Sequence, residues 1–248
     1  MKICLAQIRS AKGDIAENIT RHKRFISLAV QQNADFILFP ELSITRYEPS
    51  LAKQLATTIE DPRFDEFQSI SDNSKIVIGI GLPTIQANGT NISVALFQPF
   101  EERLLYSKKY LYPDEESFFV SGENFPVFKI NSFSIGLAIC YELSVPEHSE
   151  NAFKNGASIY IATVAKTAAG VEKAYATLSA MAKKNSVPAL MVNNVGPSDD
   201  FISAGQSAVW NSRGDLLENL DAENQGILVF DTGTNKVNKQ LLKEQSIV

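Results

Sequence analysis

A chain of 248 residues with 44% hydrophobic side chains is large and apolar enough to bury a core, and the simplest prediction is one domain over residues 1–248. The 23 basic and 28 acidic side chains give a formal charge of −5 and are interspersed, so neither nucleic acid nor an anionic membrane is an expected partner. Cys4 and Cys140 cannot form a disulfide framework and have no second ligand at zinc spacing, which fits a reducing, cytoplasmic location.

The first predicted elements along the chain are a strand, a helix and a second strand. Residues 2–8 form an apolar run that charge follows too quickly for a signal peptide or a membrane span. Asp14-Ile15-Ala16-Glu17 is a capping-box start, and apolar residues then recur at helical spacing up to Asn33. Residues 35–39 form a run that is apolar after Asp35 and stops at Pro40, which is typical of a strand with both faces covered.

Short apolar runs and helical patterns alternate through the rest of the chain. Strands are expected at 76–81, 92–97, 133–139, 159–163, 189–193 and 226–230. Helical patterns cover residues 146–155 and 171–185. This alternation predicts an α/β domain with helices outside a largely buried sheet system. Residues 232–248 are expected to form a C-terminal tail, either frayed or crossing onto a neighbouring subunit.

Side chains capable of chemistry interrupt the apolar pattern at three places. Glu41 follows a wholly apolar strand, residues 106–116 interleave lysines and glutamates with aromatic residues, and Cys140 ends a strand. Each place taken singly has an ordinary explanation, namely a solvated strand end, a charged loop and an inert buried thiol. Taken together they provide a nucleophile, a carboxylate to accept its proton and a cation to hold an oxyanion, which are the components of thiol-mediated acyl transfer.

In these contexts the chain resembles the nitrilase (carbon-nitrogen hydrolase) superfamily. The resemblance rests on Pro40-Glu41 after an apolar strand, on Tyr106-Ser107-Lys108, and on Cys140-Tyr141-Glu142 followed by Pro146-Glu147. Weaker matches extend it over roughly the first 230 residues. The resemblance implies a four-layer α-β-β-α sandwich that commonly associates as a homodimer and that needs no metal or organic cofactor.

The resemblance also assigns roles to individual residues. It implies that Glu41 is the base, that Cys140 is the nucleophile, and that Lys108 rather than Lys109 is the catalytic lysine. Glu115 is implied as a second, supporting glutamate, with the adjacent Glu116 as a competitor. The residues expected around the substrate or its oxyanion are Tyr141, Glu142, Tyr47, Tyr110 and Val164.

The implied reaction is hydrolysis of a small linear amide or carbamoyl compound through a thioester on Cys140. Tyr141 in place of a tryptophan makes the chain look like the amidase branches more than the true nitrilases. Tyr110 stands where a histidine often follows the lysine, and Arg46 where a glycine often follows the glutamate. Both positions are expected to touch the pocket, so the sequence does not determine the identity of the substrate. Acyl transfer to an amine and a catalytically silent binding protein are the alternatives.

A papain-like pairing of Cys140 with a histidine is disfavoured by the sequence. His22 is expected on the polar side of the first helix. His148 is expected at an exposed helix start. Neither histidine is therefore predicted to reach the thiol.

Overall fold

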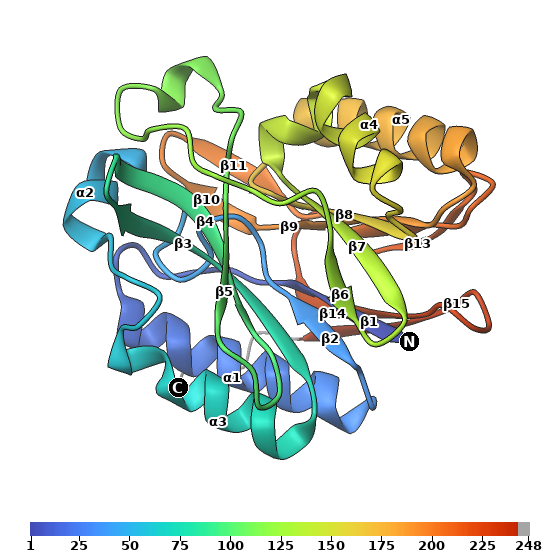
Figure 1. Cartoon of the computed structure of the whole chain (residues 1–248), viewed down its shortest axis with the longest axis horizontal. Coiled ribbons are helices and arrows are strands. Elements are labelled where there is room, and N and C mark those ends of the chain that lie inside the picture. The colour runs from blue at the N-terminus through green and yellow to red at the C-terminus, as the bar shows by residue number, and fades with distance from the viewer. Residues whose placement is uncertain (243–248) are drawn as a thin grey trace.

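The computed structural model describes residues 1–242 and shows four layers (Figure 1). Helices α1 (Ile15–Gln31) and α3 (Asp65–Ser74) cover one outer face. Helices α4 (Pro146–Lys154) and α5 (Ala168–Asn185) cover the other, and two sheets lie between them. The predicted α-β-β-α sandwich is therefore confirmed. A further short helix, α2 (Ala52–Leu55), lies at one end of the sandwich.

The first sheet has seven strands in the order β15-β14-β1-β2-β3-β4-β5. The pairs β1·β2 and β2·β3 are parallel, and the remaining pairs are antiparallel. The strands are β1 (Lys2–Gln7), β2 (Phe36–Leu38), β3 (Val77–Gln86), β4 (Gly89–Phe97), β5 (Leu104–Ser107), β14 (Gln225–Asp231) and β15 (Lys236–Leu242). The two ends of the described chain thus meet in one sheet, where β14 pairs with β1.

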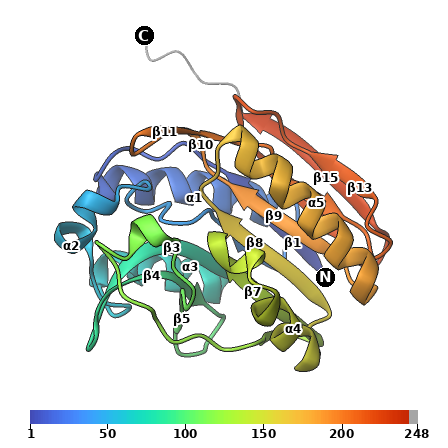
Figure 2. The same cartoon turned by 90° about the horizontal axis from the view of Figure 1, so that it is seen from above.

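The second sheet has six strands in the order β13-β12-β9-β8-β7-β6, and a separate hairpin pairs β10 with β11. Strands β7, β8 and β9 are parallel to one another, and α4 and α5 lie over them (Figure 2). The strands are β6 (Phe128–Ile130), β7 (Phe133–Ile139), β8 (Ile159–Val164), β9 (Ala189–Asn193), β10 (Val195–Ser198), β11 (Phe201–Ala204), β12 (Ala208–Trp210) and β13 (Leu216–Asn219).

Three apolar clusters hold the layers together, as β1 illustrates. Ile3 and Leu5 face the other sheet and belong to the central cluster, together with Leu137 and Ile161 of β7 and β8. The intervening residue Cys4 points the opposite way, into the cluster beneath α1. Alternate residues of a strand face opposite sides, so one short segment contributes to two cores. Each fully buried aliphatic side chain is worth about 1.5–3 kcal/mol.

The start of α1 agrees only partly with the sequence prediction. Asp14 caps the helix by accepting a hydrogen bond from Glu17 N at 3.0 Å. The Glu17 side chain binds Arg21 instead of returning to the cap, so the reciprocal half of a capping box is missing. The prediction for His22 was wrong: it is fully buried, and its ring nitrogens contact Asn18 O and Ser43 Oγ.

The C-terminal segment also differs from the prediction. Residues 236–242 form β15, which pairs antiparallel with β14 at the edge of the seven-stranded sheet. The expected tail is therefore a strand over these residues, because main-chain hydrogen bonds to β14 order a segment whose side chains are mostly polar. Residues 243–248 of the expected tail lie outside the described residues.

The turn that carries Glu41 after β2 rests directly on β3. Ile44 N donates to Gly81 O at 3.0 Å. A Cβ atom at Gly81 would lie 2.3 Å from Pro40 O and 2.6 Å from Leu42 N. Both atoms belong to the backbone on either side of Glu41, so they cannot retreat without moving it. Gly81 is therefore required by the close approach of two main chains.

We expect Gly81→Ala to lower the free energy of unfolding by about 2 kcal/mol or more, because the added methyl group overpacks a rigid site. Urea unfolding monitored by circular dichroism measures this change. Gly233→Ala is the matched control, since its nearest contact is Asp231 Oδ1 at 3.4 Å. A Gly81→Ala protein as stable as this control would contradict the close approach.

Candidate active site

Cys140 occupies a strained turn at the end of β7. Its φ of 46° lies in the left-handed region, which costs a non-glycine residue of order 1–2 kcal/mol. The 3₁₀ turn Cys140–Ser144 begins at this residue. The side chain of Glu142 stabilises the turn by accepting hydrogen bonds from Ile139 N at 2.9 Å and Lys109 N at 2.7 Å. Glu142 thus ties the turn to the residue before Cys140 and to the backbone at Lys109.

Lys108 lies between two buried carboxylates. Its Nζ donates to Glu41 Oε1 at 2.8 Å and to Glu115 Oε1 at 2.7 Å. The three side chains are at most 2% exposed. Glu41 follows β2, Lys108 follows β5, and Glu115 ends the 3₁₀ turn Pro113–Glu115. The ends of two strands of the same sheet and one turn therefore bring together groups that are up to 74 residues apart in the sequence.

Glu115, and not Glu116, contacts Lys108. Besides the lysine, Glu115 accepts hydrogen bonds from Tyr47 Oη at 3.0 Å and from Tyr112 N at 2.8 Å. Glu116 is exposed. The structure thus gives Glu115 three donors and a fixed orientation, which suits a residue that positions the lysine.

Burial and mutual charge set the proton affinities of this group. Burial alone would lower the pKa of Lys108, but the charges of Glu41 and Glu115 outweigh it and raise the pKa, so the ammonium persists. Burial raises the pKa of Glu41, with Lys108 opposing and Glu115 adding to the shift. Two carboxylates against one ammonium therefore leave Glu41 ready to take up a proton.

The Cys140 thiol is the third component. Burial, reinforced by the charge of Glu41, raises its pKa to about 11, while Lys166 and Lys108 act in the opposite direction. Glu41 Oε2 has no hydrogen-bond partner within residues 1–242. The Cys140 side chain is near enough to affect the pKa of the Glu41 carboxyl. Glu41 Oε2 is therefore the atom placed to accept the thiol proton.

A cavity of about 610 Å³ opens at Cys140, a volume suited to a small organic molecule. Its walls come from the loop after β2, the segment around Glu115, the ends of β7 and β8, the start of α5 and the β10–β11 turn. Its lining includes Tyr47, Asp114, Glu115, Cys140, Tyr141, Lys166, Lys173, Asp199 and Asp200. The carboxyl ends of the parallel strands thus form the floor of the site.

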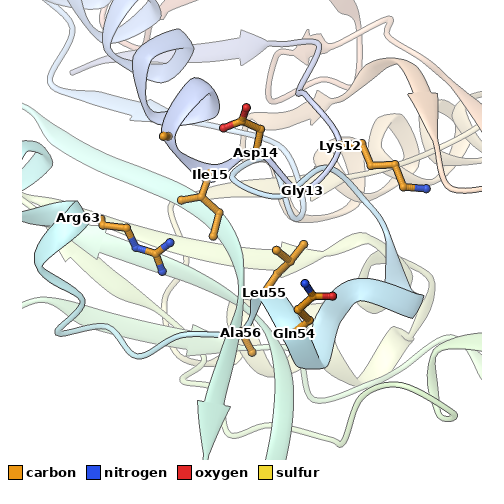
Figure 3. Close-up of a pocket in the computed structure, with 9 residues that line it drawn as sticks. Lys12, Gly13, Asp14, Ile15, Gln54, Leu55, Ala56 and Arg63 are labelled. Carbon is orange, nitrogen blue, oxygen red and sulfur yellow. The ribbon is translucent and has the colours of Figure 1, made fainter.

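A second hollow, of about 490 Å³, lies at the start of α1 (Figure 3). Its lining contains no cysteine, histidine or glutamate. The cations at its margin are already paired, Lys12 with Glu48 at 2.9 Å and Arg63 with Asp61 at 2.6 Å. This hollow therefore lacks a thiol, and its cations are engaged in ion pairs.

The expected substrate-contacting residues divide into two groups. Tyr47 and Tyr141 line the cavity. Glu142, Tyr110 and Val164 do not. Glu142 is fully buried behind the cysteine turn, and Val164 lies in the core beneath α5. The structure therefore brings two of the five expected residues to the cavity wall and keeps these three off its lining.

Tyr110 and Arg46, the two departures from the family pattern, also lie away from the cavity lining. The Tyr110 ring packs edge-on to His148, with 6.3 Å between ring centroids. Arg46 forms an ion pair with Glu48 at 2.5 Å. Both residues therefore contact neighbouring protein side chains and do not face the cavity.

His148 is buried, and the expectation of an exposed helix start was wrong. Its ring nitrogens contact Tyr106 Oη at 2.7 Å and Tyr160 Oη at 3.0 Å. Tyr106 in turn donates to Glu142 at 2.8 Å. Burial lowers the pKa of His148. The histidine is thus a neutral support for Glu142, and its ring nitrogens are engaged with tyrosines instead of the thiol.

Sequence reasoning missed Lys166 and the turn of the β10–β11 hairpin, which also line the cavity. Lys166 is a polar side chain just past an apolar strand. The same pattern drew attention to Glu41, so it could also have identified Lys166.

Within residues 1–242, no group of three or more potential ligands could hold a metal ion. In the same part of the chain, no helix is long and apolar enough to cross a membrane.

Comparison with known proteins links this geometry to one family. The family model described as carbon-nitrogen hydrolase matches residues 2–238. An (R)-stereoselective amidase from a Pseudomonas species is 28% identical over 221 residues, which cover 88% of this chain and 80% of that protein. A solved structure of the amidase from Nesterenkonia sp. AN1, a cysteine-to-alanine mutant in complex with butyramide, is 27% identical with a TM-score of 0.83, covering 95% of this chain and 92% of that one.

A second structure of the Nesterenkonia amidase is relevant to the cysteine. It is a glutamate-to-glutamine mutant that shows the result of Michael addition of acrylamide at the active site cysteine. It is 27% identical to this chain with a TM-score of 0.82, and the match covers 95% of this chain and 94% of that one. The likeness therefore extends to proteins with a reactive cysteine.

The charge of Glu41 gives a testable prediction for the thiol. Because this negative charge disfavours the thiolate, Glu41→Gln should lower the apparent pKa of Cys140 below its value of about 11. The pH dependence of alkylation by iodoacetamide, followed by intact mass, measures this pKa. Cys140→Ala is the control and should take up no label, since Cys4 is fully buried. An unchanged or higher midpoint in Glu41→Gln would contradict the electrostatic coupling.

Proposed function

This chain belongs to the carbon-nitrogen hydrolase family and is a hydrolase, and we propose that it is a thiol-dependent amidase that cleaves a small linear amide or carbamoyl compound at Cys140. One observation carries the proposal. The Lys108 ammonium is fixed between Glu41 and Glu115 beside a strained cysteine that opens into the cavity. In this proposal the nucleophile, the base and the electrophilic cation act on one carbonyl group of the substrate.

The first chemical step transfers a proton and forms a bond. Glu41 Oε2 accepts the Cys140 proton, the thiolate attacks the amide carbon, and the carbonyl electron pair moves onto oxygen. An ammonium has three N–H donors, and Lys108 gives two of them to Glu41 and Glu115. The third donor is left for the oxyanion. With the N–H of Tyr141 as a second donor, each contact is worth about 3 kcal/mol in the transition state.

The remaining steps return the enzyme to its starting state. Protonated Glu41 gives its proton to the leaving nitrogen as the carbon-nitrogen bond breaks, which leaves a thioester on Cys140 and releases ammonia or an amine. Glu41 then removes a proton from water, and the water oxygen adds to the thioester carbon. When the carbon-sulfur bond breaks, the sulfur takes the proton back from Glu41, and the carboxylic acid leaves.

The alternatives differ in what they leave unexplained. A silent binding protein would have no use for a buried ammonium and two buried carboxylates, whose removal from water is costly. Acyl transfer would use the same thioester and differ only in replacing water by an amine. Hydrolysis is the simpler proposal, because water needs no second binding site.

We also propose that the chain is a single domain over residues 1–248 that acts as a homodimer in the cytoplasm. The homodimer is supported by the family resemblance alone. The single domain is supported by the continuous sheets that join the first and last described strands. The location is supported by the composition and by the two free cysteines.

The proposal predicts that Cys140→Ala, Glu41→Gln and Lys108→Ala each lower kcat for small amides by about 10²-fold or more, because each removes a group that acts in the transition state. Ammonia release from a panel of small amides and carbamoyl compounds measures the effect, with circular dichroism to confirm folding.

Two neighbouring residues provide matched controls. Lys109→Ala and Glu116→Gln change exposed side chains adjacent to Lys108 and Glu115, and they should keep most of the activity. Glu115→Gln, in contrast, should lower kcat. Retained turnover in a folded Cys140, Glu41 or Lys108 variant would remove the role assigned to that residue.

A further inference from the structure

Lys166 lies on the rigid floor of the cavity, next to the nucleophile. Strands β7 and β8 are parallel neighbours, so Cys140 and Lys166 leave the second sheet at the same edge. The backbone of Lys166 is fixed by Asn193, whose Oδ1 accepts from Lys166 N at 2.9 Å and whose Nδ2 donates to Lys166 O at 3.1 Å. A second donor, Ala204 N, binds Lys166 O at 2.9 Å. This lysine is therefore presented by a fixed main chain.

The ammonium of Lys166 has no counter-ion in the described chain. No carboxylate of residues 1–242 lies within ion-pair distance of its Nζ. The side chain is half-buried and lines the cavity. Its charge also acts on the neighbouring sulfur, where it opposes the rise that burial causes in the pKa of Cys140. Lys166 thus places a cation on the cavity wall next to the nucleophile.

The other charged groups near the nucleophile are either paired or exposed to solvent. Lys108 is already matched by Glu41 and Glu115. The remaining charged side chains on the wall are exposed to solvent, namely Asp114, Lys173, Asp199 and Asp200. Solvent screens these groups more effectively than the half-buried Lys166. When a substrate enters and displaces water, Lys166 is the cation that most needs a partner.

A carboxylate is the group that satisfies this requirement. A neutral substrate would leave the ammonium desolvated and unpaired, and a cationic substrate would place a like charge beside it. The first turn of α5, an 18-residue helix that begins two residues after Lys166, also lines the cavity and favours negative charge. The charge of Lys166 and the dipole of α5 therefore both favour a negatively charged group on the substrate.

We propose that the substrate is an amide that carries a carboxylate a few bonds from its carbonyl carbon, and that Lys166 binds this carboxylate. The inference rests on the proposed function, since it takes the amide carbon to lie on Cys140. Lys166 then determines specificity: it selects ω-amides of dicarboxylic acids over neutral amides of the same length.

The test compares succinamate with 4-oxopentanamide, in which a methyl ketone replaces the carboxylate. The wild-type enzyme should prefer succinamate in kcat/KM, and Lys166→Met should reduce this preference about tenfold or more, as expected for a hydrogen bond between charged groups. Both substrates use the same sulfur, so an effect of Lys166 on the thiol cancels in the ratio. Lys166→Arg should restore most of the preference.

Lys183→Met is the matched control, because Lys183 is exposed near the other end of α5 and outside the cavity lining. It should leave the preference unchanged. Wild-type turnover of both amides without a preference, or a preference that survives Lys166→Met, would overturn the inference while leaving amide hydrolysis intact.

Calorimetric binding of the same two compounds makes the test independent of turnover. In a Cys140→Ala protein, succinamate should bind about tenfold or more tightly than 4-oxopentanamide, and adding Lys166→Met should remove the difference. Equal affinities in Cys140→Ala would overturn the role of Lys166 even if no amide were hydrolysed by the wild-type enzyme.

Discussion

The burial of one ammonium between two carboxylates is the interaction on which the site depends. Lys108, Glu41 and Glu115 are removed from water together, which is tolerable only because each charge has a direct partner. Burial raises the pKa of Glu41, with Lys108 opposing and Glu115 adding to the shift, which suits this carboxylate to accept a proton from Cys140. The same pairing leaves one N–H of Lys108 for an oxyanion. Base strength and oxyanion stabilisation therefore follow from one arrangement.

The nucleophile depends on a second polar group that never meets the substrate. Cys140 has a left-handed φ, and the carboxylate of Glu142 holds the turn in that shape through backbone N–H groups. Tyr106 and His148 extend this support into the sheet. In the family motif Cys140-Tyr141-Glu142, the first residue is the proposed nucleophile, the second lines the cavity and the third stabilises the backbone of the turn. Strain at the cysteine is balanced by hydrogen bonds behind it.

The sequence predicted what local pattern and residue chemistry determine. The apolar runs located β7 and β9, and the family resemblance singled out Glu41 and Lys108, which the structure joins in an ion pair. It failed where polar residues are buried by distant partners. His22 and His148 were predicted to be exposed because their neighbours in sequence are polar. Both rings are buried, and they form hydrogen bonds with Ser43 and Tyr160. The order of residues 236–242 depends on pairing with β14, which no local pattern reveals.

Partitioning of the acyl group between water and hydroxylamine tests whether a thioester forms on Cys140. Butyramide and N-methylbutyramide release different amines but would form the same butyryl thioester. The account predicts one ratio of butyrohydroxamate to butyrate for both substrates at a given hydroxylamine concentration. A ratio that changes with the leaving amine would contradict a common covalent intermediate.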